Sequence, residues 1–188
     1  MKIISAKFVK SIRGTDSILF NPIPQIAFVG RSNVGKSSLI NCLLNSNSLV
    51  KSGKKPGKTQ EINFFLVNGN MHFVDLPGYG FSKVKFTKRE QFSKMIQWYL
   101  LEPILKRKVV FVLDARISPS DLDLEMYRIL VENNQEVIIA ANKVDALTQK
   151  ECHSNLKAIT ESFPYSIIIP CSAKTKLGRE EIWKKITE

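Results

Sequence analysis

The most informative stretch of this chain reads Gly30-Arg31-Ser32-Asn33-Val34-Gly35-Lys36-Ser37. It matches the pattern GxxxxGK[ST], which forms a phosphate-binding loop when it follows a strand and opens a helix. The apolar run from Ile26 to Val29 predicts a buried strand before it, and residues 36–45 predict a helix after it. The stretch therefore predicts a P-loop at a strand-to-helix turn.

Each residue type in this loop suits phosphate chemistry. Glycines let backbone N–H groups curl round a β-phosphate, and the N-terminus of the following helix adds partial positive charge. We expect Lys36 to bridge β- and γ-phosphate oxygens and the Ser37 hydroxyl to bind Mg²⁺.

The rest of the chain alternates short apolar runs with helical spacing. Strands are expected at 26–29, 62–67, 71–74, 109–113, 137–141 and 167–169, and helices at 36–45, 88–101, 119–132, 148–162 and 178–187. The Asn68-Gly69 pair predicts a hairpin between the second and third of these strands. This alternation predicts one α/β domain over 1–188, with a mostly parallel six-stranded sheet, one antiparallel edge strand and helices on both faces. Residues 1–24 are a short N-terminal extension, in which Ile3 to Val9 is a candidate for an additional strand.

Two segments after the P-loop suit the γ-phosphate and its metal ion. Asp75-Leu76-Pro77-Gly78 follows a strand, so Asp75 is suited to hold Mg²⁺ through water and Gly78 to direct its N–H at the γ-phosphate. The polar loop from Gly53 to Gln60 carries Thr59, whose hydroxyl is a second candidate ligand of Mg²⁺. Such a loop orders with the triphosphate and loosens after hydrolysis. We expect Lys36, Thr59 and Gly78 to act in catalysis.

Two further segments select the base. The Asp145 carboxylate of Asn142-Lys143-Val144-Asp145 can accept N1–H and the 2-amino group of guanine, and adenine would leave it unpaired. Asn142 would brace the neighbouring loops, and the Lys143 stem would lie along the base. The backbone of Cys171-Ser172-Ala173 can close the other side of the base.

Composition indicates an ordinary globular chain with an uneven charge. Residues 1–110 carry 18 Lys or Arg against five Asp or Glu, whereas residues 111–188 carry 10 against 12, giving a net charge of +11. A one-sided basic field attracts polyanions, and a solvated lysine-rich surface is the alternative explanation. The three cysteines form no pair with metal or disulfide spacing, and no apolar run is long enough to span a membrane. We expect a cytoplasmic monomer with reduced thiols.

These motifs in this order resemble those of a translation-factor-class GTPase with a Ras-like domain. Over nearly the whole chain the sequence resembles one family closely, EngB (also called YihA or YsxC), the bacterial ribosome-biogenesis GTP-binding proteins of the TrmE-Era-EngA-EngB-septin-like superfamily. The resemblance is carried by IAFVGRSNVGKSSLIN at 26–41, PGKTQEINFFLV at 56–67 and FVDLPGYGFSKV at 73–84. The NKVD segment replaces the TKxD more usual in that family and keeps the same aspartate.

The resemblance implies GTP hydrolysis, a role in late assembly of the large ribosomal subunit, and a requirement in cell division and septation. It implies Ser37 and Thr59 as Mg²⁺ ligands, and nucleotide contacts by Gly30, Arg31, Ser32, Asn33, Val34, Gly35, Lys36, Ser37, Gly57, Lys58, Thr59, Gln60, Glu61, Asp75, Leu76, Pro77, Gly78, Asn142, Lys143, Val144, Asp145, Cys171, Ser172 and Ala173.

One position departs from Ras-like proteins. Tyr79 stands where a Ras-like switch carries the glutamine that orients water, so we expect slow turnover unless a partner or a cation completes catalysis. Asn33 stands where potassium-activated relatives carry a K⁺ ligand, which makes it a candidate potassium site.

Three functions compete. The first is a GTPase switch on precursors of the large ribosomal subunit, with the basic face toward ribosomal RNA. The second is a GTP-gated adaptor for a protein partner. The third, an ATP-using P-loop enzyme, is disfavoured by Asp145 and by the order of the DLPG and NKVD segments.

Overall fold

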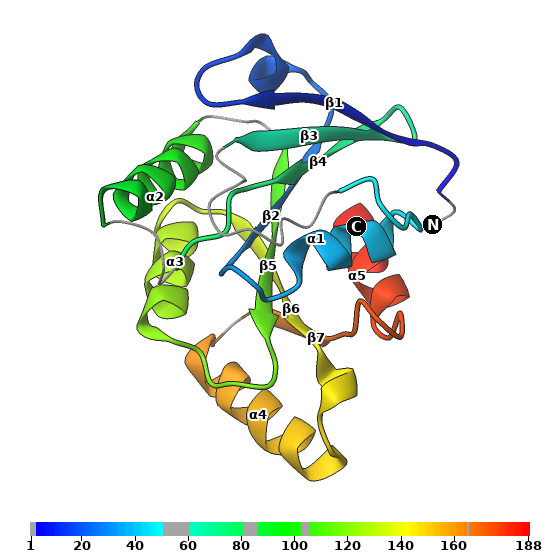
Figure 1. Cartoon of the computed structure of the whole chain (residues 1–188), viewed down its shortest axis with the longest axis vertical. Helices are drawn as coiled ribbons and strands as arrows, with labels where there is room; N and C mark the ends of the chain where they lie inside the picture. Colours follow the sequence, from blue (N-terminus) through cyan, green and yellow to red (C-terminus); the bar gives the residue numbers. More distant parts are fainter. Residues whose placement is uncertain (1–2, 51–60, 81–85, 103–105, 165) are drawn as a thin grey trace.

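The computed structural model describes residues 3–50, 61–80, 86–102, 106–164 and 166–188, with backbone alone for 86–93 (Figure 1). Its elements follow in chain order: β1 (Ala6–Ile12), η1 (Ser17–Phe20), β2 (Gln25–Gly30), α1 (Lys36–Leu43), β3 (Ile62–Val67), β4 (Met71–Asp75), α2 (Phe86–Leu101), β5 (Arg107–Asp114), α3 (Asp121–Glu132), β6 (Glu136–Asn142), η2 (Val144–Ala146), α4 (Gln149–Ser162), β7 (Ile167–Pro170) and α5 (Arg179–Thr187).

The strands form one mixed sheet in the order β1-β3-β4-β2-β5-β6-β7. Strand β3 pairs antiparallel with both β1 and β4, and the remaining pairs are parallel. This confirms the predicted α/β sheet. The described residues give seven strands in place of six, because residues 6–12 of the N-terminal extension pair with β3 and become the edge. An edge strand carries lysines and exposed positions rather than a continuous apolar run, so its pattern was ambiguous.

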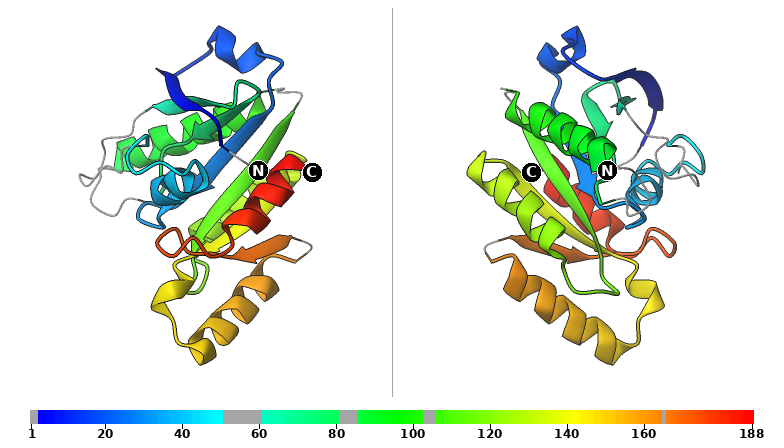
Figure 2. Two further views of the ribbon diagram at one scale, coloured as in Figure 1. Left: turned by 90° about the vertical axis from the view of Figure 1, so that its right-hand side faces the viewer. Right: turned by 60° about the vertical axis from the view of Figure 1, so that its left-hand side comes forward.

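Helices cover both faces of the sheet. One core joins α1 and α5 to the sheet through residues such as Leu39, Ile40 and Trp183. The other joins α2, α3 and α4 through residues such as Tyr99, Leu130 and Phe163. The turned views in Figure 2 show this separation, with α1 and α5 together on one side of the sheet. The central strands β2 and β5 lie between these two cores, which explains their continuous apolar runs.

Local chemistry sets the turns and helix starts. In the β3–β4 hairpin, Asn68 and Gly69 both adopt positive φ angles (49° and 72°), as the Asn-Gly pair predicts. Helix α3 begins at Asp121 rather than at Pro119. The reason is that Ser120 is its N-cap, with its N–H and hydroxyl both donating to Asp123 Oδ2 (2.9 and 2.7 Å).

The sheet gathers the predicted motifs at one edge. Strands β2, β4, β5, β6 and β7 run in the same direction and end at Gly30, Asp75, Asp114, Asn142 and Pro170. Strand β3 runs the other way, so its start also lies at this edge, where Asn63 pairs with Asp75. The carboxyl edge of a parallel sheet is where α/β proteins bind ligands.

The turn between β7 and α5 depends on a glycine. Gly178 is the N-cap of α5 with φ 71°, and a Cβ there would lie 2.3 Å from the carbonyl oxygen of Pro170. Gly69 has nearly the same φ (72°), but no atom lies within 4 Å of its Cβ position. Comparing alanine substitutions at these two glycines therefore distinguishes the cost of a strained backbone from the cost of a steric clash.

We predict that Gly178→Ala lowers the free energy of unfolding by about 3 kcal/mol, because strain and clash add. Gly69→Ala, the matched control, should lose only about 1 kcal/mol from the left-handed backbone. Urea denaturation of the two variants measures both values. Equal losses would contradict the clash at Gly178.

Candidate functional site

The loop between β2 and α1 has the shape of a phosphate cradle. Gly30 ends β2, where a Cβ would lie 2.5 Å from the carbonyl oxygen of Val112. Gly35 is the N-cap of α1 with φ 92°, and a Cβ there would lie 2.4 Å from Asn142 Nδ2. As a glycine, Gly35 has no side chain that could cap this helix, which suits the first N–H groups of the helix to an anion. Close contacts at the carboxyl edge of the sheet therefore leave no room for a side chain at either glycine of the motif.

A buried ion pair joins the P-loop to the end of β4. The Lys36 ammonium contacts Asp75 Oδ1, and the two residues are only 7% and 3% exposed. Burying one such charge alone is costly, so each holds the other in place. The structure thus brings together the residues expected to contact phosphate and Mg²⁺, and in this arrangement they contact each other.

The Asp75-to-Gly78 turn lies directly on the P-loop. The backbone N–H of Ser32 donates to the carbonyl of Tyr79 (2.9 Å), and Arg31 forms a β-bridge with Tyr79. A Cβ on Gly78 would lie 2.8 Å from Ser32 Oγ and 3.2 Å from the Ser32 backbone, so a larger residue here would have to displace Ser32. Movement of this turn therefore has to break contacts with the P-loop.

The Tyr79 side chain points into the protein toward α3. Its hydroxyl donates to Asp123 Oδ1 (2.8 Å), and Arg31 Nη1 lies 3.6 Å from Asp123 Oδ2 and donates to Ser120 Oγ (3.1 Å). Burial, and then the charge of Asp123, raise the pKa of Tyr79 well above its ordinary value, so the phenol stays protonated. The phenol therefore does not face the phosphate cradle in this conformation. The sequence reasoning did not identify Asp123, since nothing in its spacing links it to Tyr79.

Asn142 connects the P-loop with the loop after β7. Its Nδ2 donates to the carbonyl of Val34 (3.0 Å) and its Oδ1 accepts from the N–H of Ala173 (3.0 Å). The side chain is 1% exposed, so both ends of a buried amide are satisfied. The structure thus places Asn142 where the sequence expected a brace between loops.

The Asp145 carboxylate is oriented by Ser172. The Ser172 hydroxyl donates to Asp145 Oδ1 (2.6 Å) while accepting from the N–H groups of Lys174 and Thr175 (3.2 and 3.0 Å). The side chain of Asp145 is 17% exposed, and its Oδ2 lies 4.0 Å from Lys174 Nζ. One oxygen is therefore fixed by the protein, and the other faces a partly open edge. Cys171, beside this pair, is buried, which raises its pKa to about 12 and keeps it a thiol.

Lys143 connects its own segment after β6 with the P-loop and with the end of β5. Its ammonium donates to the carbonyl of Asn33 (2.5 Å) and to Asp114 Oδ2 (2.8 Å). Burial alone would raise the pKa of Asp114, but hydrogen bonds from Arg116 and Lys143 outweigh it and lower the pKa to about 2. The sequence reasoning missed Asp114 too, although an acidic residue at the end of β5 was a visible signal.

The other predicted site residues fall into two groups. Gly57, Lys58, Thr59 and Gln60 lie outside the described residues. Glu61 stands at the start of β3, at the same edge as Asp75, where its carboxylate pairs with Arg13 (3.0 Å). Ser37 lies in the first turn of α1, beside Lys36.

Two other kinds of feature are absent from the part of the chain that the structure describes. It holds no group of three or more His, Cys, Asp or Glu side chains arranged to bind a metal ion. Among the same residues, no helix has the length and apolar character needed to cross a membrane.

Comparison with known proteins identifies the family. The model of the 50S ribosome-binding GTPase family matches residues 25–143, which include the P-loop and the Asp75-to-Gly78 turn. The probable GTP-binding protein EngB of Bacillus mycoides is 41% identical over 99% of this chain and 96% of its own length. That of Bacillus subtilis is 38% identical over 99% of this chain and 97% of its own length.

Solved structures agree with the sequence relatives. A crystal structure of a probable GTP-binding protein EngB aligns with 87% of this chain and 96% of its own, at a TM-score of 0.75 and 28% identity. Era from Aquifex aeolicus, solved with GDP and aluminium fluoride, aligns with 86% of this chain and 55% of its own, at a TM-score of 0.63 and 25% identity. The chain therefore belongs to the EngB family of GTP-binding proteins and is a GTPase, which hydrolyses GTP to GDP and phosphate.

Proposed function

We propose that this GTPase is a switch in assembly of the large ribosomal subunit, which binds a precursor particle in its GTP form and leaves after hydrolysis. The observation that carries this proposal is the match of the 50S ribosome-binding GTPase model to the residues that form the phosphate cradle. The excess of 18 basic over five acidic residues in positions 1–110 supports it, because that half of the chain includes the P-loop.

We infer that nucleotide binding exchanges the partners of the buried ion pair. Phosphate oxygens would accept N–H groups of residues 33–37, and Lys36 would turn from Asp75 to the β- and γ-phosphates. Ser37, Asp75 through water, and Thr59 would hold Mg²⁺. The donors that the structure describes fit this ion, because a hydroxyl and a buried carboxylate are the oxygen ligands Mg²⁺ prefers. When bound, Mg²⁺ would neutralise charge on the transferred phosphoryl group.

We propose that Asp145 selects guanine. Its carboxylate, oriented by Ser172, would accept N1–H and the 2-amino group, while Lys143 and residues 171–173 would border the base. Adenine offers neither donor at this position and would leave the carboxylate unpaired. This is the main argument against an ATP-using enzyme.

Turnover is proposed to be slow without help. Lys36, Thr59 and Gly78 are the proposed catalytic residues, and Tyr79 donates its hydroxyl to Asp123 and so cannot orient water from this position. A partner or K⁺ would then complete catalysis. Asn33, exposed at the P-loop with φ 70°, is the candidate K⁺ ligand. Equal turnover in NaCl and KCl at saturating GTP would exclude the potassium proposal.

In the cell, we propose a cytoplasmic monomer without a membrane partner, with an associated requirement in cell division and septation. A GTP-gated adaptor for a protein is the alternative. It differs in the salt dependence of binding, because contacts with RNA phosphates release counterions and contacts with a protein surface do so far less.

We predict that Asp145→Asn weakens GDP binding about 100-fold and favours xanthine nucleotides, because the amide presents a donor where guanine also presents one. Glu125→Gln is the matched control, since it neutralises an exposed carboxylate on α3. Titration calorimetry with GDP and xanthosine diphosphate measures both affinities. Unchanged GDP affinity in Asp145→Asn would refute the assignment of the base site.

For the ribosomal role, we predict that protein loaded with a non-hydrolysable GTP analogue cosediments with large-subunit precursors, and that GDP-loaded protein does so less. Association should fall at least about tenfold between 50 and 200 mM salt if several phosphates are contacted. Cosedimentation that is insensitive to salt would favour the adaptor. No association in either nucleotide state would contradict the ribosomal role.

A further inference from the structure

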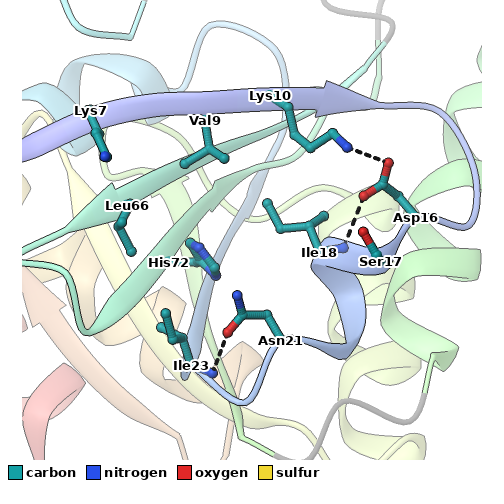
Figure 3. A pocket seen from close by; sticks show the side chains of 10 residues that line it. All are labelled: Lys7, Val9, Lys10, Asp16, Ser17, Ile18, Asn21, Ile23, Leu66 and His72. Atoms are coloured by element: carbon teal, nitrogen blue, oxygen red, sulfur yellow. Dashed lines mark hydrogen bonds and ion pairs between the residues drawn. The ribbon is translucent and has the colours of Figure 1, made fainter.

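A hollow of about 370 Å³ opens on the sheet beside β1, away from the phosphate cradle (Figure 3). Three of its residues form a row across neighbouring strands, because Lys7 pairs with Leu66 on β3 and Leu66 pairs with His72 on β4. The segment that contains η1 closes the opposite side with Ile18 and Asn21. Its volume lies within the range of small-ligand sites.

The deepest polar group of the hollow is unsatisfied. His72 is 3% exposed and its Nδ1 has no hydrogen-bond partner among the described residues. Burial lowers the pKa of His72, so the ring is neutral and carries one donor and one acceptor nitrogen. Its strand neighbour Gln25 makes its hydrogen bonds elsewhere, since Gln25 Nε2 donates to Leu19 O (3.2 Å) and its Oε1 accepts from Tyr99 (2.8 Å). A buried orphan nitrogen beside an open hollow points to a ligand.

Asn21 supplies a second polar group that is able to make a further hydrogen bond. Its Oδ1 accepts from the N–H of Ile23 (3.0 Å), which fixes the orientation of the amide, and its Nδ2 makes no hydrogen bond within the described residues. Figure 3 shows Asn21 directly beside His72, on the wall of the same space. The hollow therefore presents an amide donor next to a neutral imidazole.

The rest of the wall is apolar and the rim is basic. Val9, Ile18, Ile23 and Leu66 line the space between β1 and η1. At the rim, Lys10 is paired with Asp16 (2.6 Å), whereas Lys7 makes no ion pair with any described residue. A ligand that fits would combine an anionic group, a body with apolar faces, and a polar edge that reaches the deepest residues.

Building on the proposed ribosomal function, we propose that this hollow binds one unpaired nucleotide of RNA whose base carries an N–H beside a carbonyl, as uracil does. The base N–H would donate to His72 Nδ1, the neighbouring carbonyl would accept from Asn21 Nδ2, and the phosphate would meet Lys7. A carboxylate peptide side chain has acceptors without an adjacent donor. In the same ring orientation, with the phosphate at Lys7, cytosine places its acceptor N3 against the acceptor His72 Nδ1 and its amino group against the donor Asn21 Nδ2, so both contacts are mismatched.

The test uses the full chain with Mg²⁺ and saturating GDP, so that the guanine site is occupied, and measures fluorescence anisotropy of labelled octauridylate and octacytidylate. Octauridylate should bind about tenfold more tightly. Asn21→Asp keeps the acceptor for Ile23 and removes the donor, and His72→Leu removes the imidazole, so each should abolish this preference. His153→Leu, at an exposed histidine on α4, is the matched control and should keep it. Lys7→Ala should weaken both RNAs alike.

Three results would overturn the proposal: equal affinity for the two RNAs, a preference that survives both Asn21→Asp and His72→Leu, or displacement of octauridylate by uridine monophosphate at the octamer's own concentration. The last result would make this a free-nucleotide site. Failure here is separable from failure of the ribosomal role. Particles that cosediment while neither RNA binds would refute the hollow alone, and RNA binding without cosedimentation would refute the ribosomal role alone.

Discussion

The buried amide of Asn142 holds together the two halves of the site. It donates to the P-loop carbonyl of Val34 and accepts from the N–H of Ala173 beyond β7, so two hydrogen bonds fix the relative position of the segments that are proposed to bind phosphate and base. Its contact with the Gly35 position also explains why that residue lacks a side chain. Losing either hydrogen bond would leave a buried polar group unpaired, which typically costs about 1–3 kcal/mol.

This rigid brace contrasts with the parts of the site that must change partners. Lys36 and Asp75 pair with each other in the interior, although both are proposed to contact the nucleotide or its metal ion. A buried charge can leave its partner only when another opposite charge replaces it. Phosphate oxygens and Mg²⁺ offer those replacements together, so we infer that phosphate and metal ion bind as a unit. The contacts of Tyr79 with Ser32 and Asp123 tie this exchange to α3.

Much of this architecture could be predicted from sequence, because it depends on local pattern. The apolar run of β5, the Asn68-Gly69 turn and the GxxxxGKS motif each carry their own signal, and β3 begins and ends at the predicted residues. Features that depend on distant partners could not be predicted. The pairing of β1 with β3, the Asp123 contact of Tyr79 and the orphan nitrogen of His72 arise only when separate segments meet.

The carboxyl edge of the parallel sheet therefore gathers the residues that are proposed to bind the guanine nucleotide, and the hollow beside β1 lies away from them. The most direct test is a crystal structure of the full chain grown with GDP and Mg²⁺. The account predicts a diphosphate bound by N–H groups of residues 33–37, Lys36 moved from Asp75 to the β-phosphate, and Asp145 on the guanine edge. A diphosphate lodged elsewhere, or Asp145 turned away from the base, would contradict it.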